Sequence, residues 1–146
     1  MRSLQNQFIL KLLEETMKHV SFKEIPLEEV SVEGAKGAKI RWLIGERDGA
    51  PHFAKRMFEI EVGGHTPYHI HDFEHLIFVL DGLGELVTEN GKSQMNPWDV
   101  IYVDPNMKHN FVNIGDKPLI FLCSVPFEVK KEVKKNPFAS GKANNC

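Results

Sequence analysis

The sequence predicts an all-β fold, a sandwich or barrel of short strands in a single domain. After Pro26, short runs rich in β-branched and aromatic residues alternate with glycine, asparagine, aspartate and proline. Several strands at this spacing are typical of antiparallel sandwiches and barrels. A chain of 146 residues suits one domain of this kind and can bury a substantial core.

The beginning of the chain is patterned as a helix. Apolar residues recur at helix spacing between Leu4 and Met17, and most charged residues lie outside that stripe. The pattern predicts an amphipathic helix that packs on the domain or on a partner subunit, with a membrane-surface helix as the alternative. We therefore divide the chain into a helical extension at 1–24, a β-barrel domain at 25–130 and a polar C-terminal tail at 131–146.

The strands of the barrel domain are bounded by clear turn signals. Asn90-Gly91 indicates a type I′ hairpin, and a second tight turn is expected at residues 104–106. The runs expected to be extended are AKIRWLIG (38–45), HFAKRMFEIEV (52–62), HLIFVLDG (75–82), GELVTEN (84–90), DVIYVDP (99–105), HNFVNIG (109–115) and PLIFLCSVP (118–126).

Composition and charge exclude several classes of partner. A net charge of -2 without a basic stripe argues against nucleic-acid binding. No apolar run approaches the length of a membrane span, and the apolar stretch near the N-terminus is too short for a signal peptide. The two cysteines, Cys123 in an apolar run and Cys146 at the last position, do not suggest a disulfide framework. We therefore expect a cytoplasmic protein without a nucleic-acid or membrane partner.

Three histidines stand close together in the middle of the chain. His69, His71 and His75 are all odd-numbered, so an extended segment with a bend near residues 72–73 would place them on one inward face. Buried together without a cation, their rings would lack partners and would repel one another when protonated. A divalent cation that binds one nitrogen of each neutral ring removes both costs, so the cluster predicts a metal site.

The opposite face of the same segment is also apolar. Leu76, Phe78 and Leu80 alternate with Ile77 and Val79, which would continue the inward face as core. We expect protein to cover both faces of this strand.

A fourth histidine follows the tight turn at residues 104–106. His109 enters the next strand, and Phe111 and Asn113 share its face. If this strand lies across the barrel, His109 is placed to supply a fourth metal ligand.

These two segments resemble the two sequence motifs of the cupin superfamily. The resemblance covers about residues 34–127 and implies a cupin-type double-stranded β-helix, a jelly-roll barrel, here with an added N-terminal helix. Matching positions are Gly63, His69, His71, His75 and Gly82 in the first motif, and Asp99, Pro105, His109 and Asn113 in the second. Two departures are Trp98, where a glycine is usual, and Asn106, which replaces a turn glycine and tolerates the left-handed conformation.

Position 75 departs most from the usual cupin pattern. Most metal-binding cupins carry glutamate there, but Glu74 is one residue short and its parity turns it to the opposite face. We therefore assign His75 as the ligand. The chain is similar to a smaller group of single-domain cupins with four histidines, several of them manganese-binding proteins from thermophiles.

The resemblance has consequences for the cofactor and the oligomer. It implies manganese, iron, nickel or copper, with manganese or iron first, and imidazole ligands also accept zinc. Four neutral ligands leave the 2+ charge of the ion uncompensated and favour an anionic ligand. The resemblance also implies a homodimer that acts on a small molecule.

Other residues near the expected site have open roles. Asp72 would either accept a ring N–H or face solvent, and Asn113 would either orient a ligand ring or bond to backbone. Phe73 and Phe111 would either wall the pocket or serve as plain core. Cys123, if it faces inward, would lie near the metal, although inert packing is the commoner fate of such a residue.

Three functions fit these features. The first is a metal-dependent oxidoreductase, dioxygenase-like, that acts on a small organic substrate. The second is a metal-dependent isomerase or lyase that uses the ion as a Lewis acid. The third is a non-catalytic module that binds a small molecule or a metal. We place the oxidoreductase first, although the fold alone does not decide among them.

Overall fold

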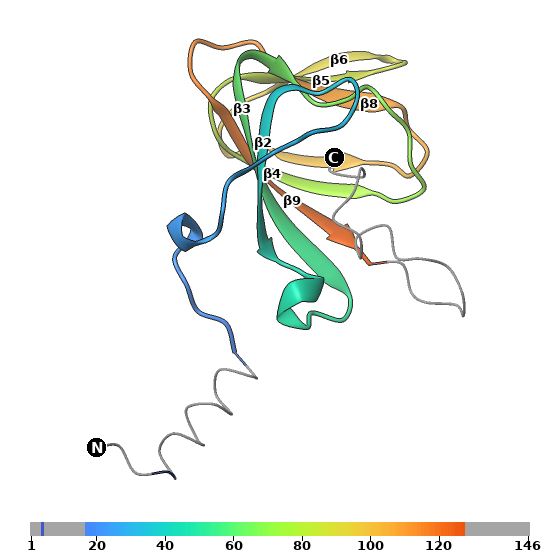
Figure 1. Ribbon diagram of the computed structural model, residues 1–146. Helices are drawn as coiled ribbons and strands as arrows, with labels where there is room; N and C mark the ends of the chain where they lie inside the picture. Colours follow the sequence, from blue (N-terminus) through green and yellow to red (C-terminus); the bar gives the residue numbers. More distant parts are fainter. Residues whose placement is uncertain (1–3, 5–16, 128–146) are drawn as a thin grey trace.

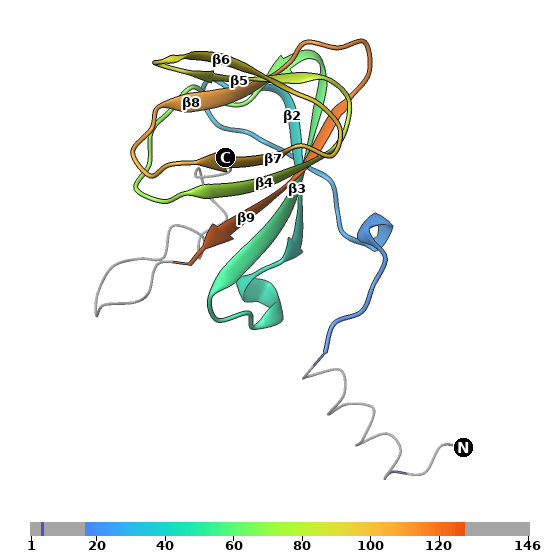
Figure 2. The same ribbon diagram turned by 180° about the vertical axis from the view of Figure 1, so that it is seen from behind.

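The structure, a computed structural model, describes residue 4 and residues 17–127. Within these residues the chain forms one curled antiparallel sheet, which confirms the expected all-β barrel class (Figures 1 and 2). The elements are η1 (Phe22–Glu24), β1 (Glu28–Glu29), β2 (Lys36–Ile44), η2 (Glu46–Asp48), β3 (Phe53–His65), β4 (His75–Asp81), β5 (Gly84–Thr88), β6 (Gly91–Met95), β7 (Val100–Val103), β8 (His109–Asn113) and β9 (Leu119–Pro126).

Two sequence predictions concern segments that the structure largely leaves out. The predicted helical extension at 1–24 lies mostly outside the described residues, and its described part contains the short 3-10 turn η1. The predicted tail at 131–146 lies entirely outside them. In the part of the chain that is described, no helix is long and apolar enough to cross a membrane.

The long strand β3 makes the sheet curl. The strand order is β6-β5-β8-β3-β9-β4-β7, with β2 also paired to β3 and β1 paired to β2. Residues 53–60 of β3 pair with β9, whereas its last residue, His65, pairs with Val112 of β8. One strand therefore joins the two parts of the sheet that appear above and below each other in Figure 1.

Alternating side chains fill the interior of the curl. Along β9, Leu119, Phe121, Cys123 and Val125 are buried while the residues between them are more exposed. The ring of Phe121 stacks on Phe58 of β3 with centroids 5.2 Å apart. Buried aromatic pairs of this kind add about 0.5–1.5 kcal/mol beyond their burial.

Turn geometry agrees with the sequence in part. Asn106 adopts a φ of 63°, as expected for a residue that replaces a turn glycine. The hairpin between β5 and β6 also forms, but its central residues are Glu89 and Asn90, neither of which has a positive φ. The predicted type I′ turn at Asn90-Gly91 is therefore wrong, because Thr88 pairs with Gly91 and the turn lies one residue earlier.

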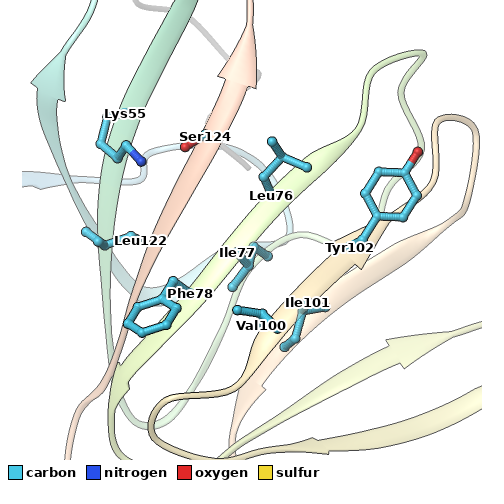
Figure 3. Close-up of a pocket in the computed structure, with 9 residues that line it drawn as sticks. All are labelled: Lys55, Leu76, Ile77, Phe78, Val100, Ile101, Tyr102, Leu122 and Ser124. Atoms are coloured by element: carbon cyan, nitrogen blue, oxygen red, sulfur yellow. The ribbon is translucent and has the colours of Figure 1, made fainter.

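The outer face of β4, β7 and β9 is apolar and open. A groove of about 420 Å³ lies here, lined by residues that include Leu76, Val100, Tyr102 and Leu122 (Figure 3). Leu76 is 49% exposed, Val100 78% and Tyr102 60%. We expected protein to cover this face of β4, and within residues 17–127 the cover is partial. Leu76 is exposed, whereas Phe78 and Leu80 are partly buried and the Trp98 ring lies against Phe78.

The two end strands of the strand order, β6 and β7, differ in the polarity of their exposed side chains. β6 ends one side with Lys92, Ser93 and Gln94 exposed, and polar side chains of this kind disfavour edge-to-edge pairing. β7 ends the other side with Val100 and Tyr102 exposed, and it carries no charge within its bounds.

Trp98 extends the apolar face next to β7. Its side chain is 74% exposed and lies edge-on to Phe78, with ring centroids 5.9 Å apart. Its φ is 73°, a conformation that a bulky side chain rarely adopts. An exposed indole beside an open apolar strand is typical of a surface that a partner protein buries.

We propose that a second copy of this chain packs on the outer face about a twofold axis, with the exposed Val100 and Tyr102 side chains of β7 in the contact. Val100→Lys combined with Tyr102→Lys should convert a dimer to a monomer, because each copy would place lysines at the centre of the contact. Light scattering after size exclusion measures the mass. Ser93→Lys on the polar β6 edge is the control and should remain dimeric. A monomeric parent protein, or a dimer that survives the double substitution, contradicts the proposal.

Candidate metal centre

Backbone pairing brings the histidines together from separate segments. His69 lies in the loop after β3 and exchanges both backbone hydrogen bonds with His109, N to O, at 3.1 and 3.0 Å. The amide of Asn106 donates to the carbonyl of His71 at 2.7 Å. His75 is the first residue of β4 and His109 the first of β8. The four histidines therefore lie on backbone segments that are hydrogen-bonded to other segments.

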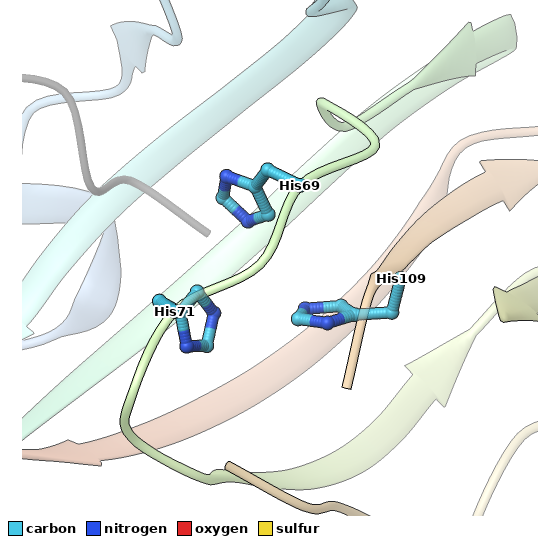
Figure 4. Close-up of side chains that lie close together, drawn as sticks. All are labelled: His69, His71 and His109. Atoms are coloured by element: carbon cyan, nitrogen blue, oxygen red, sulfur yellow. The ribbon is translucent and has the colours of Figure 1, made fainter. Parts of the chain in front are cut away.

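Three of the rings converge closely. His69, His71 and His109 each offer a nitrogen, and these nitrogens all lie within 4.8 Å of one another (Figure 4). His75 does not belong to that closest set. Its ring is nevertheless adjacent, with its centroid 4.6 Å from that of His71 and 5.0 Å from that of His109. The predicted fourth ligand thus lies beside the other three, and its ligation stays a prediction.

The hydrogen bonds of two rings assign their tautomers. His71 Nδ1 lies 2.8 Å from the carbonyl oxygen of Phe73, and His109 Nδ1 lies 2.7 Å from that of Met107. A carbonyl only accepts, so each Nδ1 carries the hydrogen and each Nε2 keeps a free lone pair. Nε2 of His109 and of His69 are buried without a hydrogen-bond partner among the described residues. Buried ring nitrogens without a hydrogen-bond partner are the kind of donor atom that a divalent cation requires.

The environment holds these rings neutral. Burial lowers the pKa of His69 to about 4, with His109 and Arg56 adding repulsion, and burial likewise lowers the pKa of His71 to about 4. Burial and then Arg56 place the pKa of His75 well below its ordinary value, and burial also lowers that of His109. Neutral rings are the form that binds a metal ion.

Arg56 is a part of this region that sequence analysis missed. It is fully buried on β3, and its Nη2 lies 3.3 Å from His75 Nδ1 and 3.1 Å from Cys123 Sγ. The sequence did hold a sign that Arg56 faces inward, because it falls at the same alternate positions of the strand as the inward-facing Ala54 and Phe58.

The aromatic candidates border the rings. Phe73 stacks on His71, with centroids 3.8 Å apart and an interplanar angle of 8°. Phe111 lies 5.5 Å from His109 and 6.1 Å from His75, centroid to centroid. These residues give the cluster apolar walls that limit the access of water.

The polar candidates lie in different places. Asp72 is exposed at the bend. Asn113 donates to the carbonyls of Ile60 and Lys117 at 2.9 and 2.8 Å and accepts from Gly115, so its amide is used by backbone. Cys123 faces inward and is buried, with Sγ 3.0 Å from His75 Nδ1.

Glu74 directly precedes β4, and its orientation away from the rings stays a prediction. It is partly buried, and its charge acts on Tyr102 of the outer face. Burial, Asp104 and Glu74 together raise the pKa of that phenol. Among the described residues, the set of convergent groups contains His69, His71 and His109 and does not include Glu74.

Comparison with known proteins gives consistent matches. The family model described as a cupin domain matches residues 56–125. The fold is similar to that of the polyketide cyclase RemF from Streptomyces resistomycificus, with 32% identity, a TM-score of 0.73, and coverage of 83% of this chain and 82% of that chain. A cupin-2 domain protein, Rru_A2000 from Rhodospirillum rubrum, shares the fold at 22% identity and a TM-score of 0.66, over 82% of this chain and 78% of that one.

A curated relative is a glucose-6-phosphate isomerase from Thermococcus litoralis. It is 33% identical over 93 residues, which cover 56% of this chain and 49% of that protein. The chain spans about half the length of the curated relatives it matches.

With a chelator present to keep the site free of metal ions, the protein should lose stability as the pH falls from 6.5 toward 4. The folded pKa of His69 and His71 is about 4 and the ordinary value is 6.5, so in this window the unfolded chain binds protons that the folded chain does not. The free energy of unfolding is therefore highest above pH 6.5 and falls as the pH drops toward 4. Urea unfolding midpoints across this range measure it.

The matched variants for that measurement are His69→Gln with His71→Gln, and His52→Gln at an exposed histidine. The double variant should reduce the pH dependence between 6.5 and 4, with the remainder due to His75 and His109, whereas His52→Gln should leave it unchanged. Equal slopes in all three proteins would show that the clustered rings titrate normally.

Proposed function

The chain belongs to the cupin superfamily, and we propose that it binds one divalent transition-metal ion through His69, His71, His75 and His109 and transforms a small oxygen-bearing substrate there. The observation that carries this proposal is the pair of buried Nε2 atoms on His69 and His109 that have no partner among the described residues. Imidazole accepts several ions, and we place manganese or iron first, as the four-histidine resemblance implies.

The residues around the cluster indicate what kind of ligand would bind. The four rings are neutral, and Arg56 adds a positive charge behind His75. A centre without carboxylate ligands favours a substrate group that is anionic or becomes so. The bound ion would supply Lewis-acid stabilisation of negative charge that develops on a substrate oxygen. Phe73 and Phe111 would keep bulk water from that oxygen.

We infer that a reaction without net oxidation, an isomerisation, cyclisation or lyase reaction of a carbonyl compound, is the better assignment. The names of two relatives support it, since one is a polyketide cyclase and the other a glucose-6-phosphate isomerase. Neither name denotes an oxidation. Both fit a centre whose charge stabilises a negative oxygen beside an activated carbon.

The dioxygenase-like oxidoreductase that the sequence analysis placed first is the second candidate. It is favoured by one feature of the donor set, four neutral imidazoles without a carboxylate, which raises the reduction potential of a bound ion relative to a carboxylate-bearing site. Coordination positions that the four histidines leave open on the ion could take the substrate in either reaction.

Substitution of single ligands should separate the contributions to metal binding. His109→Ala should weaken binding by more than the roughly 10- to 100-fold cost of losing an outer-sphere partner, because it removes one of three convergent nitrogens. His75→Ala should weaken it less, and Glu74→Ala should leave it unchanged. Elemental analysis and competition with a chelator provide the measurement. Loss of the ion from the Glu74→Ala protein would show that the ligand assignment is wrong by one residue.

Anaerobic assays should distinguish the two reaction classes. With manganese-loaded protein in deuterated water, glucose 6-phosphate and acetylacetone serve as probes, and mass spectrometry detects deuterium at the carbon beside the carbonyl. Exchange above that caused by the same concentration of free Mn²⁺, and absent with His109→Ala, is the expected result. Oxygen consumption with these or catechol probes, without exchange, would instead support the oxidoreductase.

A further inference from the structure

A buried chain of three side chains lies behind the candidate metal centre. Cys123 Sγ is 3.0 Å from His75 Nδ1 and 3.1 Å from Arg56 Nη2, and Arg56 Nη2 is 3.3 Å from the same His75 nitrogen. All three side chains are buried, Arg56 and His75 completely and Cys123 to 99%. The other nitrogen of this ring, His75 Nε2, faces His71 Nε2 at 2.8 Å.

A neutral imidazole carries one N–H, so the position of that hydrogen decides what His75 can do. If Nδ1 lacks the hydrogen, it accepts from Arg56, and Nε2–H then donates to the free lone pair of His71 Nε2. In that tautomer the ring is fully bonded but cannot ligate through Nε2. Ligation needs the hydrogen on Nδ1, next to a guanidinium that only donates.

Cys123 offers an acceptor for a hydrogen on His75 Nδ1. Its sulfur is the acceptor near His75 Nδ1, and its own hydrogen can point toward the carbonyl oxygen of Ser124, 4.0 Å away. The bond from Arg56 Nη2 occupies one lone pair of the sulfur, which leaves the other for the ring. With Nδ1–H bonded in this way, the 2.8 Å between the two Nε2 atoms fits two ligands at right angles, for which bonds of 2.0–2.1 Å give about 2.8–3.0 Å.

We infer that Cys123 is a positioning residue that selects the His75 tautomer able to bind the ion, against the opposing effect of Arg56. The inference rests on the proposed function, because it assigns a role within the same centre. Without an acceptor at position 123, His75 should keep its hydrogen on Nε2 and remain bonded to His71. The centre would then ligate through His69, His71 and His109 alone.

The test uses the full chain loaded with Cu²⁺ as the probe ion. Pulsed EPR counts the coordinated imidazole nitrogens, and chelator competition measures the dissociation constant. Cys123→Val removes the acceptor while keeping an apolar side chain of similar size, and it should reduce the count from four to three and weaken binding about 10- to 100-fold. Cys123→Ser restores an acceptor and should return the count to four.

The His75→Ala background separates positioning from general damage to the fold. There, Cys123→Val should cause no further change in nitrogen count or affinity, because its only route to the ion is gone. Four nitrogens and unchanged affinity in the single Cys123→Val variant would overturn the inference, as would a Ser variant that behaves like Val.

The parent protein separates this inference from the proposed function. A parent protein with three coordinated nitrogens would overturn the inference together with the assignment of His75 as a ligand, and would leave metal binding by the other three rings standing. A parent protein that binds no ion would overturn both.

Discussion

The candidate metal centre depends on backbone pairing between the loop after β3 and strand β8, which are distant in sequence. His69 and His109 exchange both of their peptide hydrogen bonds, and Thr66 is tied to Phe111 in the same way, by its amide and its hydroxyl group. The amide of Asn106 extends the contact to His71. Because these peptide groups satisfy one another, the backbone that carries the rings is held in place without a bound ligand.

This backbone pairing places ring nitrogens in an interior that has few hydrogen-bond partners for them. The Nδ1 atoms of His71 and His109 find carbonyl partners, but the Nε2 atoms of His69 and His109 do not within the described residues. Burial then holds the rings neutral and keeps their lone pairs available. The same low-dielectric surroundings make unpaired polar atoms costly, and this cost is the physical basis of the proposed metal site.

Parity along strands accounts for most of what the sequence could predict. It placed His75 and His109 in the interior, and it identified Ile77 and Val79 as core. It could also have found Arg56, but a charged residue in a core strand contradicts the usual burial preference and is easily set aside. The open outer face was not predictable, because parity shows that a face is apolar and says nothing about which segment covers it. The bonds among Arg56, Cys123 and His75 join three strands, and no local pattern reports them.

Trp98 gives the molecule a built-in optical probe. The chain has two tryptophans, and they lie in opposite environments: Trp98 is exposed beside the open strand, whereas Trp42 is partly buried with the Arg56 guanidinium 5.7 Å above its ring. An indole emits at longer wavelength in water than in an apolar interior. Replacing one tryptophan by phenylalanine would therefore leave a fluorophore that reports on the outer surface or on the interior behind the histidines, and each side could be followed without an added label.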